Sequence, residues 1–277
     1  MPPQPTRVRI PDLIRMKVRG EKIAILTAYD ATMARLLDRA GIDVLLVGDS
    51  LGTVILGYET TVPVTLEAMI HHTRAVAQGS SRALVVADLP FLTYQVNVEE
   101  TVRNAGRLIQ EGGAAAVKLE GGETVADRVH RLSEIGIAVM GHIGLTPQSV
   151  HRLGGYRMVG KTPEEADRLL RDARILEQAG AFSVVLECVP PDVSASITAA
   201  LKIPTIGIGA GPDCDGQVLV SYDAFGLFDG FQPSFVKRYA DLAGQLSGAT
   251  RQYIDDVRQG RFPAAAHGVD TVADRTR

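Results

Sequence analysis

Eight short apolar runs, separated by stretches of helical periodicity, constrain the fold of this chain more than any other feature. Most are continuous in Val, Ile, Leu and Ala, which is typical of strands covered on both faces. They cover residues 22–27, 43–48, 83–87, 115–119, 137–141, 183–187, 203–208 and, more weakly, 217–220. Strand–helix alternation predicts a parallel sheet, and eight units favour a closed barrel. The predicted fold class is therefore α/β, a (β/α)8 barrel.

The size and composition of the chain fit this prediction. A length of 277 residues suits one barrel of about 250 residues, so we expect a single domain over 1–277, with weakly ordered tails at about 1–10 and 264–277. The net charge of −3 gives no indication of a nucleic-acid partner. No run approaches the roughly 18 apolar residues that span a bilayer. Two cysteines without paired spacing and no secretory signal predict a reduced, cytoplasmic setting.

Charged residues stand where several of these runs stop. Four acids and one histidine occupy such positions: Asp49, Asp88, Glu120, Glu187 and His142. In a parallel α/β fold the carboxyl ends of the strands form the edge where active sites are assembled. Buried charge is also costly unless it is compensated. The pattern therefore predicts an enzyme.

Strand parity turns these positions into one predicted site. Residues two apart share a face, so Lys118 and Glu120 point the same way. Four crowded carboxylates cannot all stay ionised without counter-charge. Lys118 offsets one, and a hard cation such as Mg2+, which selects oxygen ligands, accounts for others. We assign Asp49 and Asp88 as direct ligands and Glu120 as a ligand reached directly or through water. That leaves Glu187 as the candidate general base.

Structural alternatives exist for each residue taken alone. Asp49 before Ser50, or Asp88 before Pro90, could cap or turn the chain. Lys118 could form a salt bridge in the barrel core, and His142 could be a core histidine. The coincidence of all these positions at one sheet edge favours a functional site. Two long segments, 50–64 and 143–161, leave the same edge and are candidates for covering it.

Nine short motifs carry a resemblance to a known family, in order over about residues 12–262. They are TAYD (27–30), LLVGDSLG (45–52), ADLPF (87–91), VKLEGG (117–122), GHIGLTPQSV (141–150), GGY (154–156), LECVP (186–190), IGIGAG (206–211) and DGQVLV (215–220). The chain resembles the ketopantoate hydroxymethyltransferase family of the pantothenate pathway. The resemblance implies a TIM barrel of the phosphoenolpyruvate mutase/isocitrate lyase type, a Mg2+ ion and homo-oligomers, commonly decamers.

The resemblance also implies a reaction and residue roles. A hydroxymethyl group passes from 5,10-methylenetetrahydrofolate to 3-methyl-2-oxobutanoate, giving 2-dehydropantoate through Mg2+-assisted enolisation and C–C bond formation. Implied roles place Asp49, Asp88 and Glu120 at the metal, and Glu187 as proton acceptor. Around the keto acid it places Asp49, Ser50, Asp88 and Lys118. We expect His142 to contact the substrate or orient a neighbour. One departure is Tyr222, where many relatives resemble each other in having His.

Two rival functions stay open at this point. One is a Mg2+-dependent C–C or P–C lyase of the same superfamily. Resemblance to those lyases would require a catalytic Cys in a Cys-Gly-His loop, which neither Cys188 nor Cys214 provides. The other rival is a non-catalytic barrel used for binding or assembly. Such a barrel would be expected to lose the acids at its rim, and all of them are present.

Overall fold

The computed structural model describes residues 6–155 and 157–268. The ends of both expected tails, 1–5 and 269–277, and Tyr156 of the GGY motif lie outside the described residues. The chain divides into two compact units, Met1–Ser221 and Tyr222–Arg277, and each is described by itself. That residues 1–277 form a single domain stays a prediction.

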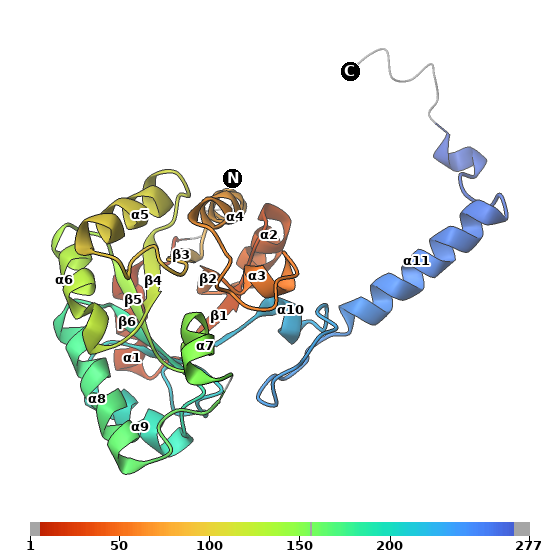
Figure 1. Cartoon of the computed structure of the whole chain (residues 1–277). Helices are drawn as coiled ribbons and strands as arrows, with labels where there is room; N and C mark the ends of the chain where they lie inside the picture. Colours follow the sequence, from red (N-terminus) through yellow and green to blue (C-terminus); the bar gives the residue numbers. More distant parts are fainter. Residues whose placement is uncertain (1–5, 156, 269–277) are drawn as a thin grey trace. The chain divides into compact units, whose positions relative to one another are not determined.

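The first unit is a closed barrel of eight parallel strands that pair in sequence order, with β8 returning to β1 (Figure 1). The strands are β1 Ile23–Thr27, β2 Val44–Val47, β3 Leu84–Asp88, β4 Ala116–Glu120, β5 Val139–Gly144, β6 Ser183–Glu187, β7 Thr205–Ile208 and β8 Gly216–Leu219. Every predicted run overlaps one strand, including the weak eighth one. The prediction of a (β/α)8 barrel is confirmed.

Helices surround the strands in Figure 1. In this unit they are α1 Ile10–Arg19, α2 Ala31–Ala40, α3 Leu51–Val54, α4 Leu66–Gly79, α5 Val98–Gln110, α6 Ala126–Glu134, α7 Val150–Leu153, α8 Pro163–Gln178 and α9 Pro191–Ala200, with 3-10 turns η1 Glu123–Val125 and η2 Pro147–Ser149. Side chains cap the starts of two of these helices. Asn97 Oδ1 accepts from the Glu100 N–H and Thr162 Oγ1 from the Glu165 N–H, which satisfies first-turn donors of α5 and α8.

The part of the barrel interior nearer the amino ends of the strands is apolar. Its core includes one residue from each of four neighbouring strands: Val86, Ala116, Met140 and Val185. Two residues further along these strands come Asp88, Lys118, His142 and Glu187. Since residues two apart share a face, the charged residues continue the inner face above the core. The strands therefore deliver these side chains to one place.

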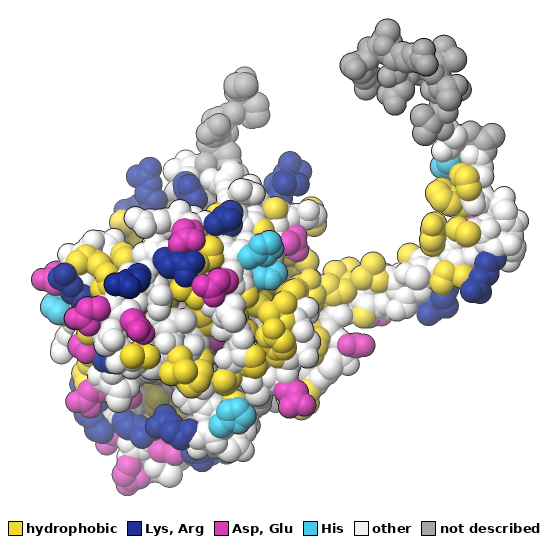
Figure 2. Space-filling model, turned by 45° about the horizontal axis from the view of Figure 1, so that its top comes forward, with side chains coloured by type: hydrophobic (Ala, Val, Ile, Leu, Met, Phe, Trp, Pro, Cys, Tyr) yellow, Lys and Arg dark blue, Asp and Glu magenta, His cyan; other side chains and the backbone are white. Residues whose placement is uncertain are grey.

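The second unit contains the helix α11 Leu242–Arg258, after the short helix α10 Ser221–Ala224, which begins at the boundary, and before the 3-10 turn η3 Ala265–His267. None of the described residues of α11 is buried. Apolar side chains are exposed along it at Leu246, Tyr253, Ile254 and Val257. Figure 2 shows hydrophobic side chains on the surface of this helix. Among the described residues, no helix has the length and apolar character needed to cross a membrane.

Candidate active site

The predicted acids and bases come together at the carboxyl ends of neighbouring strands. Strand register places Asp88 beside Lys118 and Glu120 beside His142. Asp49 lies two residues beyond the end of β2, and its backbone N–H donates to Asp88 Oδ2 at 3.1 Å. All five of these side chains belong to buried residues. The structure thus brings together the residues that strand parity predicted.

Asp88 and Lys118 form a buried ion pair, with Lys118 Nζ 3.0 Å from Asp88 Oδ2. Burial raises the pKa of Asp88, although the ammonium of Lys118 opposes this rise. Burial likewise lowers the pKa of Lys118, but Asp88, Glu120 and Asp49 outweigh burial and hold it above its ordinary value. The other oxygen, Asp88 Oδ1, is buried and has no hydrogen-bond partner among the described residues. A buried carboxylate oxygen without a donor is unusual, and a water or a cation would satisfy it.

Asp49 carries the clearest sign of missing positive charge. Burial raises its pKa to about 8, and repulsion from Asp88 and Glu120 adds to this effect. One donor to its carboxylate is the side-chain amide of Gln148, with Nε2 2.9 Å from Oδ2. Without a further cation, the site therefore compensates for its crowded charge by holding a proton on Asp49.

His142 lies between two carboxylates. Its Nδ1 is 3.5 Å from Glu120 Oε1 and its Nε2 is 3.2 Å from Glu187 Oε2. The contact with Glu187 is short enough for an ion pair, but Nε2 makes no hydrogen bond to the described residues. Burial and Lys118 lower the pKa of His142, but the two carboxylates outweigh them and raise it to about 9. The raised pKa favours the imidazolium form, whose Nδ1–H would face Glu120, while the ammonium of Lys118, with Nζ 3.4 Å from Nδ1, opposes that charge.

Glu187 ends β6 at the more open side of the site, with 16% of its side chain exposed. Backbone contacts hold this strand end: Gly144 pairs with Glu187, and the N–H of Leu145 donates to the Glu187 carbonyl at 2.8 Å. The next residue, Cys188, has a φ of 49°, which is uncommon for a residue other than glycine. Burial and Glu187 raise the pKa of the Cys188 thiol to about 11. Cys188 therefore lacks the low pKa of a reactive thiolate.

Ser50, predicted at the substrate, lies at the start of the segment that follows β2. Its Oγ is 2.9 Å from the hydroxyl of Tyr29, which belongs to the TAYD motif. Ser50 is half-buried, whereas its neighbour Asp49 is buried. The structure therefore places Ser50 next to Asp49, and its contact with substrate stays a prediction.

Sequence reasoning missed two residues of this site, Tyr94 and Gln148. The hydroxyl of Tyr94 accepts from the Glu120 N–H at 3.1 Å, and the N–H of Gln148 donates to Glu120 Oε2 at 3.1 Å. Both side chains are buried. The motif GHIGLTPQSV contained Gln148, and its place in a long segment leaving the carboxyl edge is the signal that could have identified it.

A divalent cation fits part of the predicted ligand set. Among the described residues, no three His, Cys, Asp or Glu side chains are arranged so that they could hold a metal ion together. Mg2+, however, usually takes one or two carboxylates and completes its shell with water and substrate oxygens. Asp49 and the unpaired Oδ1 of Asp88 suit such a site. The oxygens of Glu120 already face Gln148 and His142, which suits contact through water.

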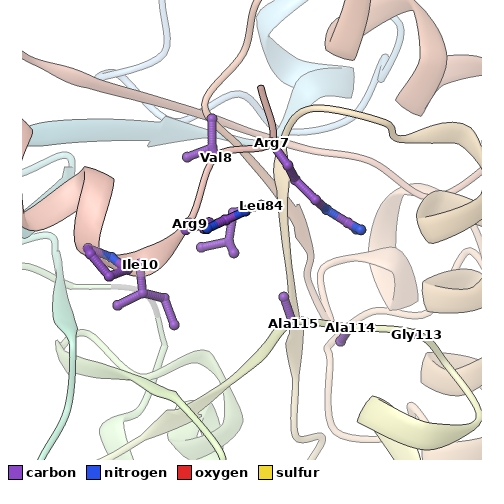
Figure 3. A pocket seen from close by; sticks show the side chains of 9 residues that line it. Arg7, Val8, Arg9, Ile10, Leu84, Gly113, Ala114 and Ala115 are labelled. Atoms are coloured by element: carbon purple, nitrogen blue, oxygen red, sulfur yellow. The ribbon is translucent and has the colours of Figure 1, made fainter. Parts of the chain in front are cut away.

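A cavity of about 440 Å³ lies elsewhere on the barrel (Figure 3). It is lined by residues 7–11, Leu84 and residues 113–115. Leu84 begins β3, and residues 113–115 immediately precede β4. This cavity therefore opens at the amino ends of these strands, and none of the candidate site residues lines it.

Known proteins resemble this chain over nearly its full length. The sequence model of the family described as ketopantoate hydroxymethyltransferase matches residues 7–265. A 3-methyl-2-oxobutanoate hydroxymethyltransferase of Moorella thermoacetica is 58% identical over 264 residues, which is 95% of this chain and 98% of the relative. The enzyme of the same name from Syntrophus aciditrophicus is 59% identical over 252 residues, covering 91% of this chain and 93% of the relative.

Solved structures agree on the fold. A 2,3-dimethylmalate lyase, a member of the PEP mutase/isocitrate lyase superfamily, has a TM-score of 0.59 at 17% identity, covering 98% of this chain and 93% of that one. A phosphonopyruvate hydrolase in complex with oxalate and Mg2+ has a TM-score of 0.59 at 14% identity, covering 93% and 92%. These similarities support the fold, whereas the sequence matches define the closer kinship. The chain belongs to the ketopantoate hydroxymethyltransferase family.

Proposed function

We propose that this enzyme transfers a hydroxymethyl group from 5,10-methylenetetrahydrofolate to 3-methyl-2-oxobutanoate, giving 2-dehydropantoate. Relatives 54–59% identical to the chain carry the corresponding name. The observation that carries the chemistry is the buried Oδ1 of Asp88, which has no hydrogen-bond partner among the described residues, beside Asp49, whose pKa burial and the neighbouring carboxylates raise to about 8. Both features indicate a place for a cation at the edge of the sheet where the substrate would react.

Asp49 and Asp88 would hold a Mg2+ ion, with Glu120 in contact directly or through water. A bound Mg2+ would supply Lewis-acid polarisation of the keto group and stabilise the enolate. Lys118, held at Asp88, adds a fixed positive charge near the same position. We further propose that Ser50 and His142 contribute to the surroundings of the keto acid.

Glu187 would take the proton from C3 of the keto acid. Removing a proton from a tertiary carbon beside a ketone needs a base within hydrogen-bond reach. Glu187 is less enclosed than the other acids of the site, so a substrate can approach it. The ring of His142, with Nε2 3.2 Å from Glu187 Oε2, would orient this carboxylate before the proton is taken.

Loss of the C3 proton to solvent tests this proposal directly. In D2O, 3-methyl-2-oxobutanoate should exchange its C3 proton when the enzyme and Mg2+ are both present, even without the folate cosubstrate. Adding 5,10-methylenetetrahydrofolate should then give 2-dehydropantoate. Exchange that is equally fast without Mg2+ would contradict the metal-assisted mechanism. Cleavage of a methylisocitrate-like or phosphonate substrate would instead favour the lyase alternative.

We also propose that the protein is a homo-oligomer, as the family resemblance implies. The exposed apolar side chains of α11, spaced at Leu246, Tyr253 and Val257, form a stripe at helical spacing. Such a stripe is typical of a protein–protein contact. Light scattering should give a mass several times that of the 29.6 kDa chain, ten times for a decamer. A monomeric mass would contradict the proposal.

A cytoplasmic location is proposed from the cysteines. Cys188 and Cys214 are both free, which fits a reducing compartment. Fractionation of the source cells should recover the activity with cytoplasmic marker enzymes.

A further inference from the structure

The side chain of Gln148 uses its whole hydrogen-bonding capacity inside the site. Its Nε2 donates to Asp49 Oδ2 at 2.9 Å and to the Leu89 carbonyl at 3.0 Å. Its Oε1 lies 2.8 Å from the Tyr94 hydroxyl and 3.1 Å from Gln95 Nε2. A backbone carbonyl can only accept, so the amide nitrogen must face Leu89 and, on the same side, Asp49. Chemistry therefore fixes the orientation of this amide.

The backbone of Gln148 holds a second carboxylate. Its N–H donates to Glu120 Oε2 at 3.1 Å. Gln148 therefore contacts two of the three residues proposed to surround the cation, one through its side chain and one through its backbone. It reaches them from η2, in the segment that follows β5, so the position of this segment and the geometry of the carboxylates are linked.

Tyr94 holds the far side of the amide. Its hydroxyl accepts from the Glu120 N–H at 3.1 Å and has one proton to give. That proton can go to Gln148 Oε1 at 2.8 Å or to the Glu120 carbonyl at 3.1 Å. The contact with Gln148 is the shorter of the two, and Gln148 Oε1 is an acceptor that needs a donor. Both facts favour donation from Tyr94 to Gln148. Tyr94 thus acts on Asp49 only through Gln148.

We propose that Gln148 is a positioning residue for the divalent cation: it sets the orientations of the Asp49 and Glu120 carboxylates, and Tyr94 holds its amide in place. The inference rests on the cation site of the proposed function. A neighbour that orients a ligand typically contributes 10- to 100-fold to metal affinity. Gln148 is buried, with 5% of its surface exposed, so loss of the side-chain contacts should reach this range.

Gln148→Met tests the inference because it keeps the length of the side chain and the backbone N–H to Glu120 while removing the amide. Calorimetric titration with Mg2+ alone should give a dissociation constant about 10- to 100-fold higher than that of the unaltered protein. Tyr94→Phe should weaken binding in the same direction. In the double variant the two losses of affinity should be less than additive, because Tyr94 acts on Asp49 through Gln148, although it also contacts Glu120 directly. Gln110→Met, at an exposed position of α5, is the matched control and should bind normally.

The outcomes separate this inference from the proposed function. If the unaltered protein binds Mg2+, Asp88→Ala does not, and Gln148→Met binds normally, the cation site stands and the positioning role is refuted. A lower melting temperature with an unchanged dissociation constant would likewise refute it, since that is the signature of a purely structural residue. If Gln148→Met does not fold, unchanged Mg2+ affinity of Tyr94→Phe refutes the inference. Absence of Mg2+ binding by the unaltered protein would overturn both.

Discussion

Binding of Mg2+ to this enzyme should release a proton, and its affinity should depend on pH. In the metal-free protein, burial, Asp88 and Glu120 raise the pKa of Asp49 to about 8. At pH 7, about nine-tenths of the molecules therefore carry this proton. A metal ligand must be deprotonated, so binding at this pH should expel close to one proton for each ion.

The size of the effect follows from the same pKa. If only the ionised carboxylate of Asp49 binds, the apparent affinity rises about tenfold for each pH unit below 8 and levels off above it. Between pH 6 and pH 9 the total gain is about 90-fold. The pKa values of Lys118 and His142 are both raised, the latter to about 9. Both cations therefore keep their charge over most of this range and should not mask the dependence.

Calorimetry in pairs of buffers that differ in ionisation enthalpy measures both the number of protons released and the dissociation constant of Mg2+. At pH 6 and 7 the observed heat should change with the buffer as expected for about one released proton, and at pH 9 as expected for only about one-tenth of a proton. In Asp49→Asn, any residual Mg2+ binding should lose its pH dependence over this range. A dissociation constant that is the same at pH 6 and pH 9, with no proton released, would refute the account of Asp49 as the group that holds the compensating proton.

Three further predictions concern the base, the end of its strand and the metal-free fold. Glu187→Gln should slow C3 proton exchange about 10²- to 10⁴-fold while still binding the keto acid, and exchange at the normal rate, measured by NMR, would exclude Glu187 as the base. Gly144 has a φ of 94°, and a Cβ there would lie 2.3 Å from the Glu187 carbonyl oxygen, so Gly144→Ala should lower the free energy of unfolding in urea by about 2–4 kcal/mol. Gly136 has a φ of 88° and open space around it, so Gly136→Ala should lower it by only about 1–2 kcal/mol. Equal losses would contradict the steric argument. In the metal-free protein the raised pKa values of Asp49 and His142 mean that the folded state holds protons that the unfolded state releases, so the melting temperature should fall as the pH rises from about 6.5 to 9, and a rise would contradict these directions.

Much of the fold and of the site could be predicted from local patterns. Continuous apolar runs identify the strands. Residues two apart on a strand must share a face, so the sequence alone predicts that Val86 lies on the same face as Asp88 and Met140 on the same face as His142. Helix starts at Asn97 and Thr162 also follow from local chemistry, because a cap needs only a side-chain acceptor and an N–H three residues on.

The positions of Tyr94 and Gln148 could not be predicted in this way. Each lies in a segment after a strand, and the contact between them joins residues 54 apart. No periodicity governs where such segments fold, and a Tyr or Gln in a loop is usually exposed to solvent. The raised pKa of His142 could not be predicted either, since it results from the balance between burial, Lys118 and the carboxylates of two other residues.

The charges of the site explain why one ion can organise it. Four carboxylates, those of Asp49, Asp88, Glu120 and Glu187, face two cations, Lys118 and His142. With all six groups counted at their formal charges, two negative charges remain, and a single divalent cation cancels both. Without it, uptake of a proton by Asp49 removes only one of them. The metal-free site is therefore left with surplus negative charge, which repels an anionic keto acid. Because this repulsion acts on the whole substrate, the affinity for the keto acid should depend on Mg2+ even if the substrate contacts only Lys118 and Ser50.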